Sequence, residues 1–408
     1  MFKLLYNLAM YLYRGAIAVG AVFKPAIRCM HQGECRTPEQ LAGFAARRNG
    51  KVVWVHAASL GEFEQGRPLI ERIKKQHPHY SVVLSFFSPS GYEVRKNYPL
   101  ADLVVYLPID TPTAARRFVD TLKPDVAYFI KYEFWLNLLS QLRRRKVPTY
   151  LVSAIFRDKQ PFFRWYGGDF RRCLTTFDTI FVQDDESKRR LASIGIDRVE
   201  VVGDTRFDRV ADIAAGAKRL PIVEAFARGR QVVVAGSTWA PDESGLIPYI
   251  NTNAGRTRMI IAPHHVEPVR IGEITRQLTC RYALYTDATV ESVADADCLI
   301  INTIGLLSSV YQYGQTAYIG GGFGVGIHNT LEAAVWGVPV VFGPNYRRFR
   351  EACQLIECGA ARPISSPGEC ASAFDRFLTD NTAAAAARHY VASHTGASDK
   401  IIADLKFS

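Results

Sequence analysis

Residues 56–66 bring a serine, a glycine and an acid together in the sequence HAASLGEFEQG. The apolar run KVVWV comes directly before this stretch, and the helical pattern RPLIERIKK comes directly after it. Ser59, Gly61 and Glu62 therefore lie where a strand gives way to a helix, at the edge where open α/β sheets bind ligands. A carboxylate there can accept the proton of a reacting hydroxyl group. Glu62 is either such a reagent or an acid that stabilises the start of a helix.

A second acid occupies an equivalent position later in the chain. Glu133 belongs to KYEFWLNLL (131–139), which directly follows the strand-like run VAYFI. Two acids at such corners suggest a site that needs carboxylates. The structural alternative is that Glu133 holds a loop or a neighbouring cation in place.

A glycine-rich motif, GGGFGVGIHNTLEAAVWGVPVVFGP, spans residues 320–344. Glycines allow the backbone to approach a phosphate closely, and the amides at a helix start bind its charge. We expect a helix from about Asn329 to Trp336, with amides on a phosphate and Glu332 on a ribose hydroxyl. Asn329 and Glu332 also fit a capping box, which is the structural alternative. The candidate nucleotide-binding residues of the motif are Gly321, Gly322, His328, Asn329 and Glu332.

Two further strand ends carry polar residues. GSTWAPDES places Ser237 and Thr238 before a helix, where hydroxyls and amides suit an anion or simply cap the helix. APHHVEP places His264 and His265 side by side at the end of another strand. Two adjacent histidines could bind a metal, but no further ligands are suitably spaced. Ligand contact or a core role is therefore the better interpretation, and we expect no metal site.

Short, wholly apolar runs alternate with helical patterns along most of the chain after residue 50. This alternation is typical of a parallel sheet that is covered by helices on both faces. The pattern lapses over about 204–230 and then restarts. We therefore predict an α/β protein with two Rossmann-like domains that bind ligands in the cleft between them. The predicted ranges are an N-terminal helix at 1–35, a first Rossmann-like domain at 36–210, and a second one with C-terminal helices at 211–408; the resemblance described below implies that the first binds the acceptor and the second the nucleotide-sugar donor.

The chain has 408 residues and a formal net charge of +11, so we expect an anionic partner. Its N-terminus is nearly all apolar or aromatic over residues 4–23, with Arg14 inside and Lys3 and Lys24 outside the run. A helix lying in the membrane surface fits this pattern better than a full span, which would bury Arg14 in the bilayer. A buried first helix of the domain is the alternative. The basic runs further along are most simply solvated faces, and no nucleic-acid module is recognisable.

These stretches together resemble one known family, the 3-deoxy-D-manno-octulosonic acid (Kdo) transferases of Gram-negative bacteria. The resemblance covers nearly the whole chain and is carried by HAASLGEFEQGRPLI, KPDVAYFIKYEFWLNLL, VQDDESKRRLASIG, VGDTRFD and GIHNTLEAAVWGVPVVFGP. It implies the two-domain GT-B fold. It also implies an enzyme of lipopolysaccharide biosynthesis at the cytoplasmic face of the inner membrane. The implied reaction moves Kdo from CMP-Kdo to a lipid A precursor (lipid IVA).

The resemblance also implies roles for individual residues. Glu62 matches the family's catalytic base in an inverting, metal-independent transfer that needs no cofactor besides the donor. Ser59, Gly61 and Glu133 match the acceptor side. The positions that match the CMP-facing motifs are Ser237, Thr238, His264, His265, Gly321, Gly322, His328, Asn329 and Glu332.

The chain departs from the family pattern at two places on the donor side. The family often has an arginine where this chain has His264, so a phosphate-binding cation is missing there. A motif that commonly reads Asp-Thr-x-Gly-Glu is here Asn302 to Leu306, NTIGL. Both departures affect how the donor would be held, but not the predicted fold.

Two other functions remain compatible with the sequence. A GT-B enzyme that uses a UDP-sugar, either a transferase or an epimerase, would prefer UDP-sugars to CMP. A sugar-nucleotide or lipid-binding protein with a decayed site would show no turnover and no loss on Glu62→Ala.

Overall fold

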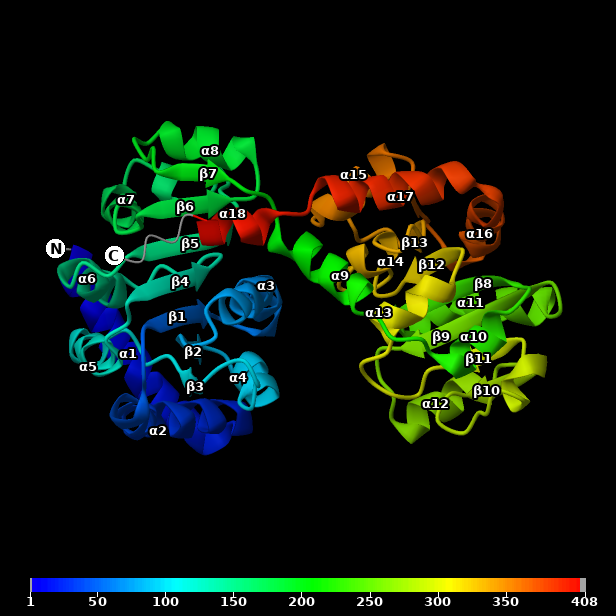
Figure 1. The fold of residues 1–408 in the computed structure, drawn as a ribbon, viewed down its shortest axis with the longest axis horizontal. Coiled ribbons are helices and arrows are strands. Elements are labelled where there is room, and N and C mark those ends of the chain that lie inside the picture. Colours follow the sequence, from blue (N-terminus) through cyan, green and yellow to red (C-terminus); the bar gives the residue numbers. More distant parts are fainter. Residues whose placement is uncertain (1, 404–408) are drawn as a thin grey trace. The chain divides into compact units, whose positions relative to one another are not determined.

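The computed structural model describes residues 2–403, which form two compact units. Residues 2–209 and 396–403 make up unit 1, and Val210–Thr395 make up unit 2. Each unit is an α/β structure built on its own seven-stranded parallel sheet (Figure 1). The prediction of two Rossmann-like α/β domains is confirmed.

Unit 1 has the strand order β3-β2-β1-β4-β5-β6-β7. Its strands are β1 (Val52–Ala57), β2 (Ser81–Phe86), β3 (Leu103–Tyr106), β4 (Val126–Ile130), β5 (Thr149–Ala154), β6 (Thr179–Val182) and β7 (Val199–Val201). Its helices are α1 (Phe2–Phe23), α2 (Pro25–Arg47), α3 (Leu60–Gln76), α4 (Pro89–Arg95), α5 (Pro112–Leu122), α6 (Leu136–Arg144), η1 (Pro161–Phe163), α7 (Gly168–Leu174), α8 (Asp185–Ala192) and α18 (Ala397–Ala403). Helix α9 (Thr205–Ala215) runs from unit 1 into unit 2.

Unit 2 has the strand order β10-β11-β9-β8-β12-β13-β14. Its strands are β8 (Gln231–Thr238), β9 (Thr257–Pro263), β10 (Tyr282–Leu284), β11 (Cys298–Ile300), β12 (Thr316–Ile319), β13 (Val340–Phe342) and β14 (Ala361–Pro363). Its helices are α10 (Pro221–Ala227), α11 (Ala240–Asn253), α12 (Pro268–Thr275), η2 (Ser292–Asp295), α13 (Leu307–Val310), η3 (Tyr311–Tyr313), α14 (Leu331–Ala334), α15 (Arg350–Glu357), η4 (Pro367–Glu369), α16 (Cys370–Thr379) and α17 (Asn381–Ser393).

The core of unit 1 lies on both faces of its sheet, which is why its strands are continuously apolar. Successive residues of a strand point to opposite faces. Val52 and Trp54 accordingly belong to one buried cluster, whereas Val53 and Val55 belong to another. Helices α5 and α6 cover one face and α3 and α4 cover the other (Figure 1). This double burial holds the strand ends in place, and the functional side chains extend from those ends.

Each sheet has one place where neighbouring strands connect in opposite directions. In unit 1 this point lies between β1 and β4, which pair in parallel. In unit 2 it lies between β8 and β12. Loops after two such strands diverge to opposite faces of the sheet and leave room for a ligand at the carboxyl ends.

The predicted domain boundaries need two corrections. Residues 396–403, expected in the second domain, belong to unit 1, where the carboxylate of Asp208 accepts hydrogen bonds from the amides of Gly396 (Oδ1) and Ser398 (Oδ2, 2.7 Å). The predicted division between 1–35 and 36–210 falls inside α2, which runs unbroken from Pro25 to Arg47. Met1 and residues 404–408 of the predicted ranges lie outside the described residues.

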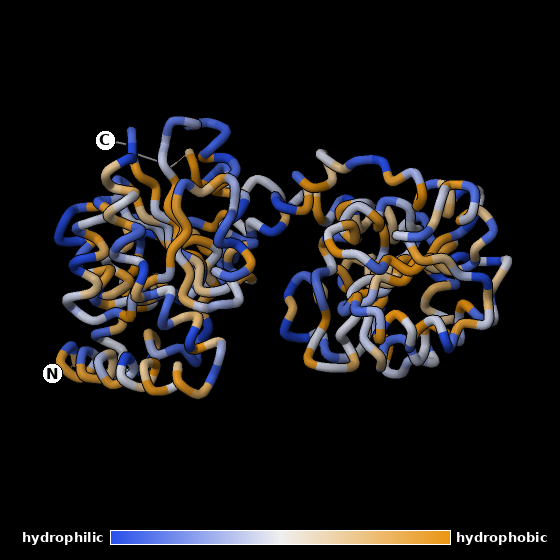
Figure 2. The backbone as a smooth tube through the Cα atoms, turned by 90° about the horizontal axis from the view of Figure 1, so that it is seen from below, coloured by the Kyte–Doolittle hydropathy of each residue, from blue (hydrophilic) through white to orange (hydrophobic). Residues whose placement is uncertain are grey.

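Helix α1 packs on unit 1 by one side only. Ile17 is buried against Met30 and Ile109, and Tyr6 donates a hydrogen bond to the buried Asp110. The other side leaves large apolar residues exposed, and the tube that starts at the N label is mostly orange (Figure 2). These exposed residues include Leu4, Leu5, Leu8, Leu12, Val19, Val22 and Phe23. No helix between residues 2 and 403 is both long and apolar enough to cross a membrane.

Candidate active site

The two candidate acids of unit 1 follow the two strands that flank its switch point. Glu62 lies in the first turn of α3, directly after β1, and Glu133 lies in the loop after β4. Strands β1 and β4 are hydrogen-bonded neighbours. The sheet order therefore places both acids at one edge, as the sequence analysis predicted from their strand-end positions.

Glu62 is lightly held. Its only hydrogen bond within the described chain comes from the hydroxyl of Ser59, which donates to Oε2. Ser59 is the N-cap residue of α3, but its side chain bonds Glu62 rather than a backbone amide. A methyl group added at Gly61 would approach only the Ser59 oxygen, at 3.8 Å, so packing alone does not require glycine there. Glu62 is half-buried and remains accessible for chemistry.

Glu133, by contrast, is held firmly through one oxygen. Its Oε2 accepts from His56 Nε2 at 3.0 Å and from Trp135 Nε1 at 2.6 Å. The His56 side chain is 0% exposed and that of Glu133 is 13% exposed. Glu133 Oε2 therefore has the structural role that the sequence analysis gave as the alternative to chemistry. Glu133 Oε1 makes no hydrogen bond or ion pair with another residue between 2 and 403, so this carboxylate oxygen stays available.

His56 connects Glu133 to the interior of the sheet. Its Nδ1 lies 2.9 Å from Ser85 Oγ, which in turn accepts from Trp54 Nε1 at 2.8 Å. Nδ1 also lies 3.1 Å from the Ser85 carbonyl oxygen, so Ser85 holds the inner side of the ring while Nε2 reaches Glu133. The sequence analysis missed His56. The available signal was a polar residue inside an otherwise apolar strand, two positions after Trp54.

Tyr132, Arg157 and Asp184 also reach this edge, and the sequence analysis did not predict them. Burial raises the pKa of Tyr132, and the negative charges of Asp184 and Glu62 raise it further, whereas Arg157 lowers it. Tyr132 follows β4, Asp184 follows β6, Glu62 follows β1 and Arg157 follows β5. The carboxyl ends of four neighbouring strands therefore contribute to one charged cluster. Their common signal in the sequence is a polar residue just beyond an apolar run.

In unit 2, Asp242 joins the loops that follow β8 and β12. Its carboxylate accepts from the Trp239 amide at 2.9 Å, the Gly321 amide at 2.9 Å and the Tyr318 hydroxyl at 2.7 Å. Asp242 is buried in the first turn of α11. The sequence analysis did not single out Asp242, because Tyr318 and Gly321 lie nearly 80 positions away along the chain.

The glycines of the 320–344 motif have a structural reason that the sequence did not reveal. Gly321 has a positive φ of 89°, and a methyl group on Gly322 would lie 2.5 Å from the Gly343 amide nitrogen. The loop after β12 therefore packs against backbone from the start of the loop after β13. This close approach keeps the loop compact, and it accounts for the glycines without any bound phosphate.

Indole and imidazole rings gather at the edge where β8, β9 and β12 end. Trp239 stacks on His264 with ring centres 4.5 Å apart, and His264 stacks on His328 at 4.8 Å. His265 meets Trp239 edge-on at 5.1 Å. Burial lowers the pKa of both His264 and His328, so these rings are neutral at pH 7. Trp239 Nε1 donates to His328 Nε2 at 3.1 Å.

The remaining predicted donor residues differ in how far they are engaged. Thr238 is buried and donates to Glu243 Oε1 at 2.9 Å, whereas Ser237 is half-buried with a positive φ of 54°, a strained conformation for a residue with a side chain. Asn329 Nδ2 donates to Glu332 Oε1 at 3.1 Å, and Asn329 Oδ1 accepts from the Leu331 amide at 3.1 Å, directly before α14 (Leu331–Ala334). Thr330 rather than Asn329 occupies the N-cap position and makes no side-chain cap bond, so the capping-box alternative is not confirmed, and the helix is shorter than predicted.

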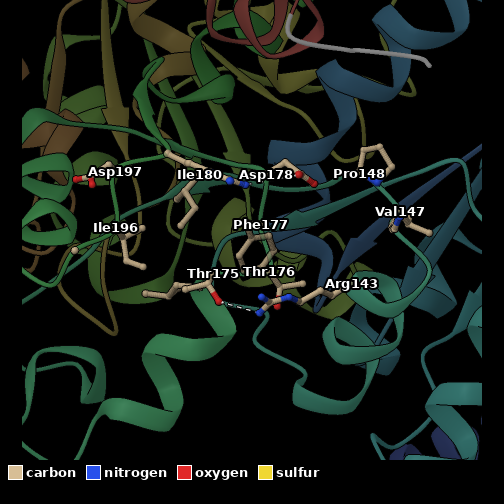
Figure 3. Close-up of a pocket in the computed structure, with 14 residues that line it drawn as sticks. Arg143, Val147, Pro148, Thr175, Thr176, Phe177, Asp178, Ile180, Ile196 and Asp197 are labelled. Carbon is tan, nitrogen blue, oxygen red and sulfur yellow. Dashed lines mark hydrogen bonds and ion pairs between the residues drawn. The ribbon is translucent and has the colours of Figure 1, made fainter.

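Neither a metal cluster nor a pocket at the opposite sheet edge offers an alternative site for these residues. Among residues 2–403, no group of three or more His, Cys, Asp and Glu residues is arranged to hold a metal ion. A pocket of about 590 Å³ lies at the opposite edge of the unit 1 sheet, beside the residues that precede β5, β6 and β7 (Figure 3). There Arg143 donates to Thr175 at 3.2 Å, and no acid from the predicted site lines it.

The comparisons with known proteins agree with this architecture. Residues 35–209 match the family model described as 3-Deoxy-D-manno-octulosonic-acid transferase (kdotransferase). The 3-deoxy-D-manno-octulosonic acid transferase of Bordetella pertussis is 28% identical over 413 residues, covering 93% of this chain and 94% of that protein. The enzyme of the same name from Aquifex aeolicus is 27% identical over 312 residues, covering 75% and 80%.

Solved structures support the fold alone. The UDP-GlcNAc 2-epimerase of Neisseria meningitidis bound to UDP-GlcNAc aligns with a TM-score of 0.61 at 16% identity, covering 87% of this chain and 99% of that chain. MurG of Acinetobacter baumannii aligns with a TM-score of 0.54 at 12% identity, covering 87% and 98%. With its two parallel-sheet units in the GT-B fold, the chain is similar over most of its length to 3-deoxy-D-manno-octulosonic acid transferases.

Proposed function

We propose that this protein transfers Kdo from CMP-Kdo to a lipid A precursor, with inversion at the anomeric carbon and with Glu62 as general base. The single observation that carries the assignment of the base is the contrast between the two acids of unit 1. Within residues 2–403, Glu62 is bonded only by Ser59, whereas Glu133 is fixed by His56 and Trp135. A base must be free to take a proton, and a positioning group must not move.

In the proposed step, a hydroxyl oxygen of the acceptor forms a bond to the anomeric carbon of Kdo. Its proton passes to the carboxylate of Glu62. The bond between that carbon and the phosphate oxygen of CMP breaks, and its electron pair stays on CMP. Because CMP leaves as a phosphomonoester, the departing group needs stabilisation by amides and hydrogen-bond donors rather than by a strong acid. Glu133 Oε1 is the second oxygen available to orient the acceptor.

The ring cluster of unit 2 supports a nucleotide ligand. Trp239 offers an aromatic face, and Ser237 lies in the strained turn beside it. His264 has a lowered pKa, so at neutral pH it supplies a hydrogen bond rather than the positive charge that an arginine would bring. We expect no metal requirement, because the proposed leaving group is already stable as an anion.

The exposed side of α1 supports work at a membrane, where the proposed lipid acceptor resides. Leu4, Leu8 and Leu12 recur every four residues and therefore lie along one exposed stripe of the helix. An amphipathic helix of this kind lies in the interface of a bilayer and is favoured by anionic lipids when the protein is basic. We place the protein at the cytoplasmic face of the inner membrane.

A turnover assay tests the proposal. Purified protein is mixed with CMP-Kdo generated in situ and a tetraacylated, bisphosphorylated lipid A precursor. Glu62→Ala is measured beside the control Glu64→Ala, which removes the same charge two residues later but from a side chain that pairs with Arg95 at 2.8 Å. We expect release of CMP and a glycolipid heavier by one or more Kdo units, lost in the first variant and retained in the second.

Each other outcome changes a specific part of the proposal. Turnover with a UDP-sugar but not with CMP-Kdo would replace the donor and leave the fold assignment intact. CMP binding without turnover of this lipid would reject the acceptor. Full activity of Glu62→Ala would show that Glu62 serves only the start of α3. Absence of CMP binding and of turnover would favour a protein with a decayed site.

A further inference from the structure

A cavity of about 270 Å³ in unit 1 lies apart from the residues assigned to catalysis. Its walls come from α1, α2 and α5 and from the loop after β3. None of the predicted acceptor or donor residues lines it. Its lining includes Arg14 from α1, Cys35 from α2, and Arg117 and Phe118 from α5. The apolar N-terminal helix therefore contributes its internal arginine to the cavity.

The cations of this cavity lack partners in the described part of the chain. Neither Arg14 nor Arg117 makes a hydrogen bond or an ion pair within residues 2–403. The neighbouring Arg116 differs, since its guanidinium lies 3.5 Å from the carboxylate of Asp120. Arg28, on the helix next to α1, is likewise engaged, because it donates to carbonyl oxygens of α1. Two free guanidinium groups at one cavity indicate an anionic ligand.

The other polar groups of the cavity point to the same conclusion. His31 lines the cavity, and its Nδ1 is buried without a hydrogen-bond partner. Glu34 is the one acid in the lining, and its Oε1 accepts from the Ile109 amide at 3.0 Å. Thr37 is also satisfied, because its hydroxyl donates to the Tyr106 carbonyl at 3.0 Å. Two guanidinium groups and His31 outnumber the single carboxylate of Glu34 in the lining, so an oxyanion complements the site better than a cation.

The size and position of the cavity indicate which oxyanion. Pockets for drug-sized ligands enclose roughly 300–1,000 Å³, so about 270 Å³ suits a headgroup rather than a whole lipid. Arg14 lies on the same helix as the exposed Leu8 and Leu12. A long cationic side chain on an interfacial helix extends toward headgroup phosphates while apolar neighbours contact the acyl region.

We propose that this cavity binds the phosphate of an anionic membrane phospholipid through Arg14, Arg117 and His31, as an anchoring site separate from the reaction centre. The proposal rests on the membrane location given under the proposed function, but not on the identity of the sugar donor. It assigns Arg14 a ligand instead of a place within the bilayer core.

Cysteine labelling provides a direct test. Cys35 lines the cavity, whereas Cys29 lies six positions earlier on the same helix and does not; both are exposed. The full chain is treated with a slow alkylating reagent, and tandem mass spectrometry reads the rate at each thiol. The probes are dihexanoyl phosphatidylglycerol below its micelle concentration, dihexanoyl phosphatidylcholine, and inorganic phosphate. We expect phosphatidylglycerol to slow labelling of Cys35 at least threefold and to leave Cys29 unchanged.

Matched variants test the residues that carry the charge. Arg117→Ala and Arg14→Ala should abolish the protection of Cys35, whereas Arg116→Ala, which removes the same charge one residue away, should retain it. An unchanged Cys29 rate in each variant shows that α2 is intact. The proposal also predicts that Arg117→Ala weakens sedimentation with phosphatidylcholine vesicles containing 30% phosphatidylglycerol more than Arg116→Ala does.

Other results would overturn the proposal in distinct ways. Equal protection by inorganic phosphate and phosphatidylglycerol would identify a free-phosphate site and not a lipid site. Equal protection by phosphatidylcholine, or none by any probe, would reject recognition of an anionic headgroup. Loss of protection in Arg116→Ala would mean that only the general positive charge matters. Because no sugar donor is present, these outcomes are independent of whether the protein transfers Kdo.

Discussion

Replacing Glu133 in two ways separates its role in holding the site from its role in chemistry. In Glu133→Gln the amide oxygen can take the place of Oε2 and still accept from His56 and Trp135. In Glu133→Ala both donors lose their acceptor. The two variants thus remove first the charge alone and then the charge together with the hydrogen bonds.

The expected magnitudes follow from burial. His56 is 0% exposed, so its orphaned N–H costs about 1–3 kcal/mol in Glu133→Ala. Trp135 is half-buried and its freed N–H can bond water, which adds about 1 kcal/mol. Glu133→Ala should therefore destabilise the β1–β4 region by about 2–4 kcal/mol. Glu133→Gln should cost only about 1 kcal/mol, because two charge-assisted bonds become neutral ones.

Native-state hydrogen exchange of the full chain is the appropriate assay. The chain has two units, so a single free energy of unfolding is poorly defined, whereas exchange reports the amides of β1 and β4 separately. Turnover is measured in parallel. If Oε1 orients the acceptor hydroxyl, Glu133→Gln should lower kcat/KM about tenfold, equivalent to about 1.4 kcal/mol, although the strands remain protected.

The reasoning fails if the two variants change exchange in β1 and β4 equally, since the His56 and Trp135 bonds would then contribute nothing to stability. It also fails for the chemical role if Glu133→Gln retains full kcat/KM. Exchange in β8 and β12, on unit 2, provides the internal control and should not change in either variant.

Three further predictions concern other parts of the protein. Burial raises the pKa of Asp110 from 3.8 to about 7, so the folded state holds a proton that the unfolded state releases. The free energy of unfolding should therefore fall by up to about 4 kcal/mol as pH rises from 4 to 7. Asp110→Asn should remove that pH dependence, as measured by urea titrations followed by hydrogen exchange of unit 1. Trp165 is 92% exposed beside Arg164, and Trp165→Ala should weaken sedimentation with anionic vesicles several-fold without changing CMP affinity measured by calorimetry. Gly322→Ala would place a methyl 2.5 Å from the Gly343 nitrogen and should destabilise β12 and β13 by about 1–3 kcal/mol. Gly324→Ala, whose methyl would meet only the Gly321 carbonyl oxygen at an ordinary 3.6 Å, should not; equal exchange in both variants would refute this.

Much of the candidate site could be predicted from strand ends alone. Each candidate follows an apolar run, and within one parallel sheet such positions share an edge: Glu62 and Glu133 do so in unit 1, and Ser237 and His264 do so in unit 2. Local spacing also predicted that Asn329 and Glu332 would meet, but their bond joins the two side chains and is not the side-chain-to-backbone pair of a capping box. The extent of the helix that follows was predicted less well, because helix ends depend on tertiary contacts.

The amino-acid sequence by itself therefore determined the two α/β units, the resemblance to Kdo transferases, and which residues lie at the carboxyl ends of strands, because these follow from short-range hydrophobic periodicity and contiguous motifs. Tertiary structure alone decided which of two similar acids is held and which is free. The partner of Glu133 is His56, 77 positions away, and no local pattern encodes that pairing. It likewise decided that Asp208 holds the returning segment from Gly396 on unit 1, 188 positions along the chain. Hydrogen bonds of such separation form only after strand order and helix packing have brought distant residues together, so they are properties of the folded chain.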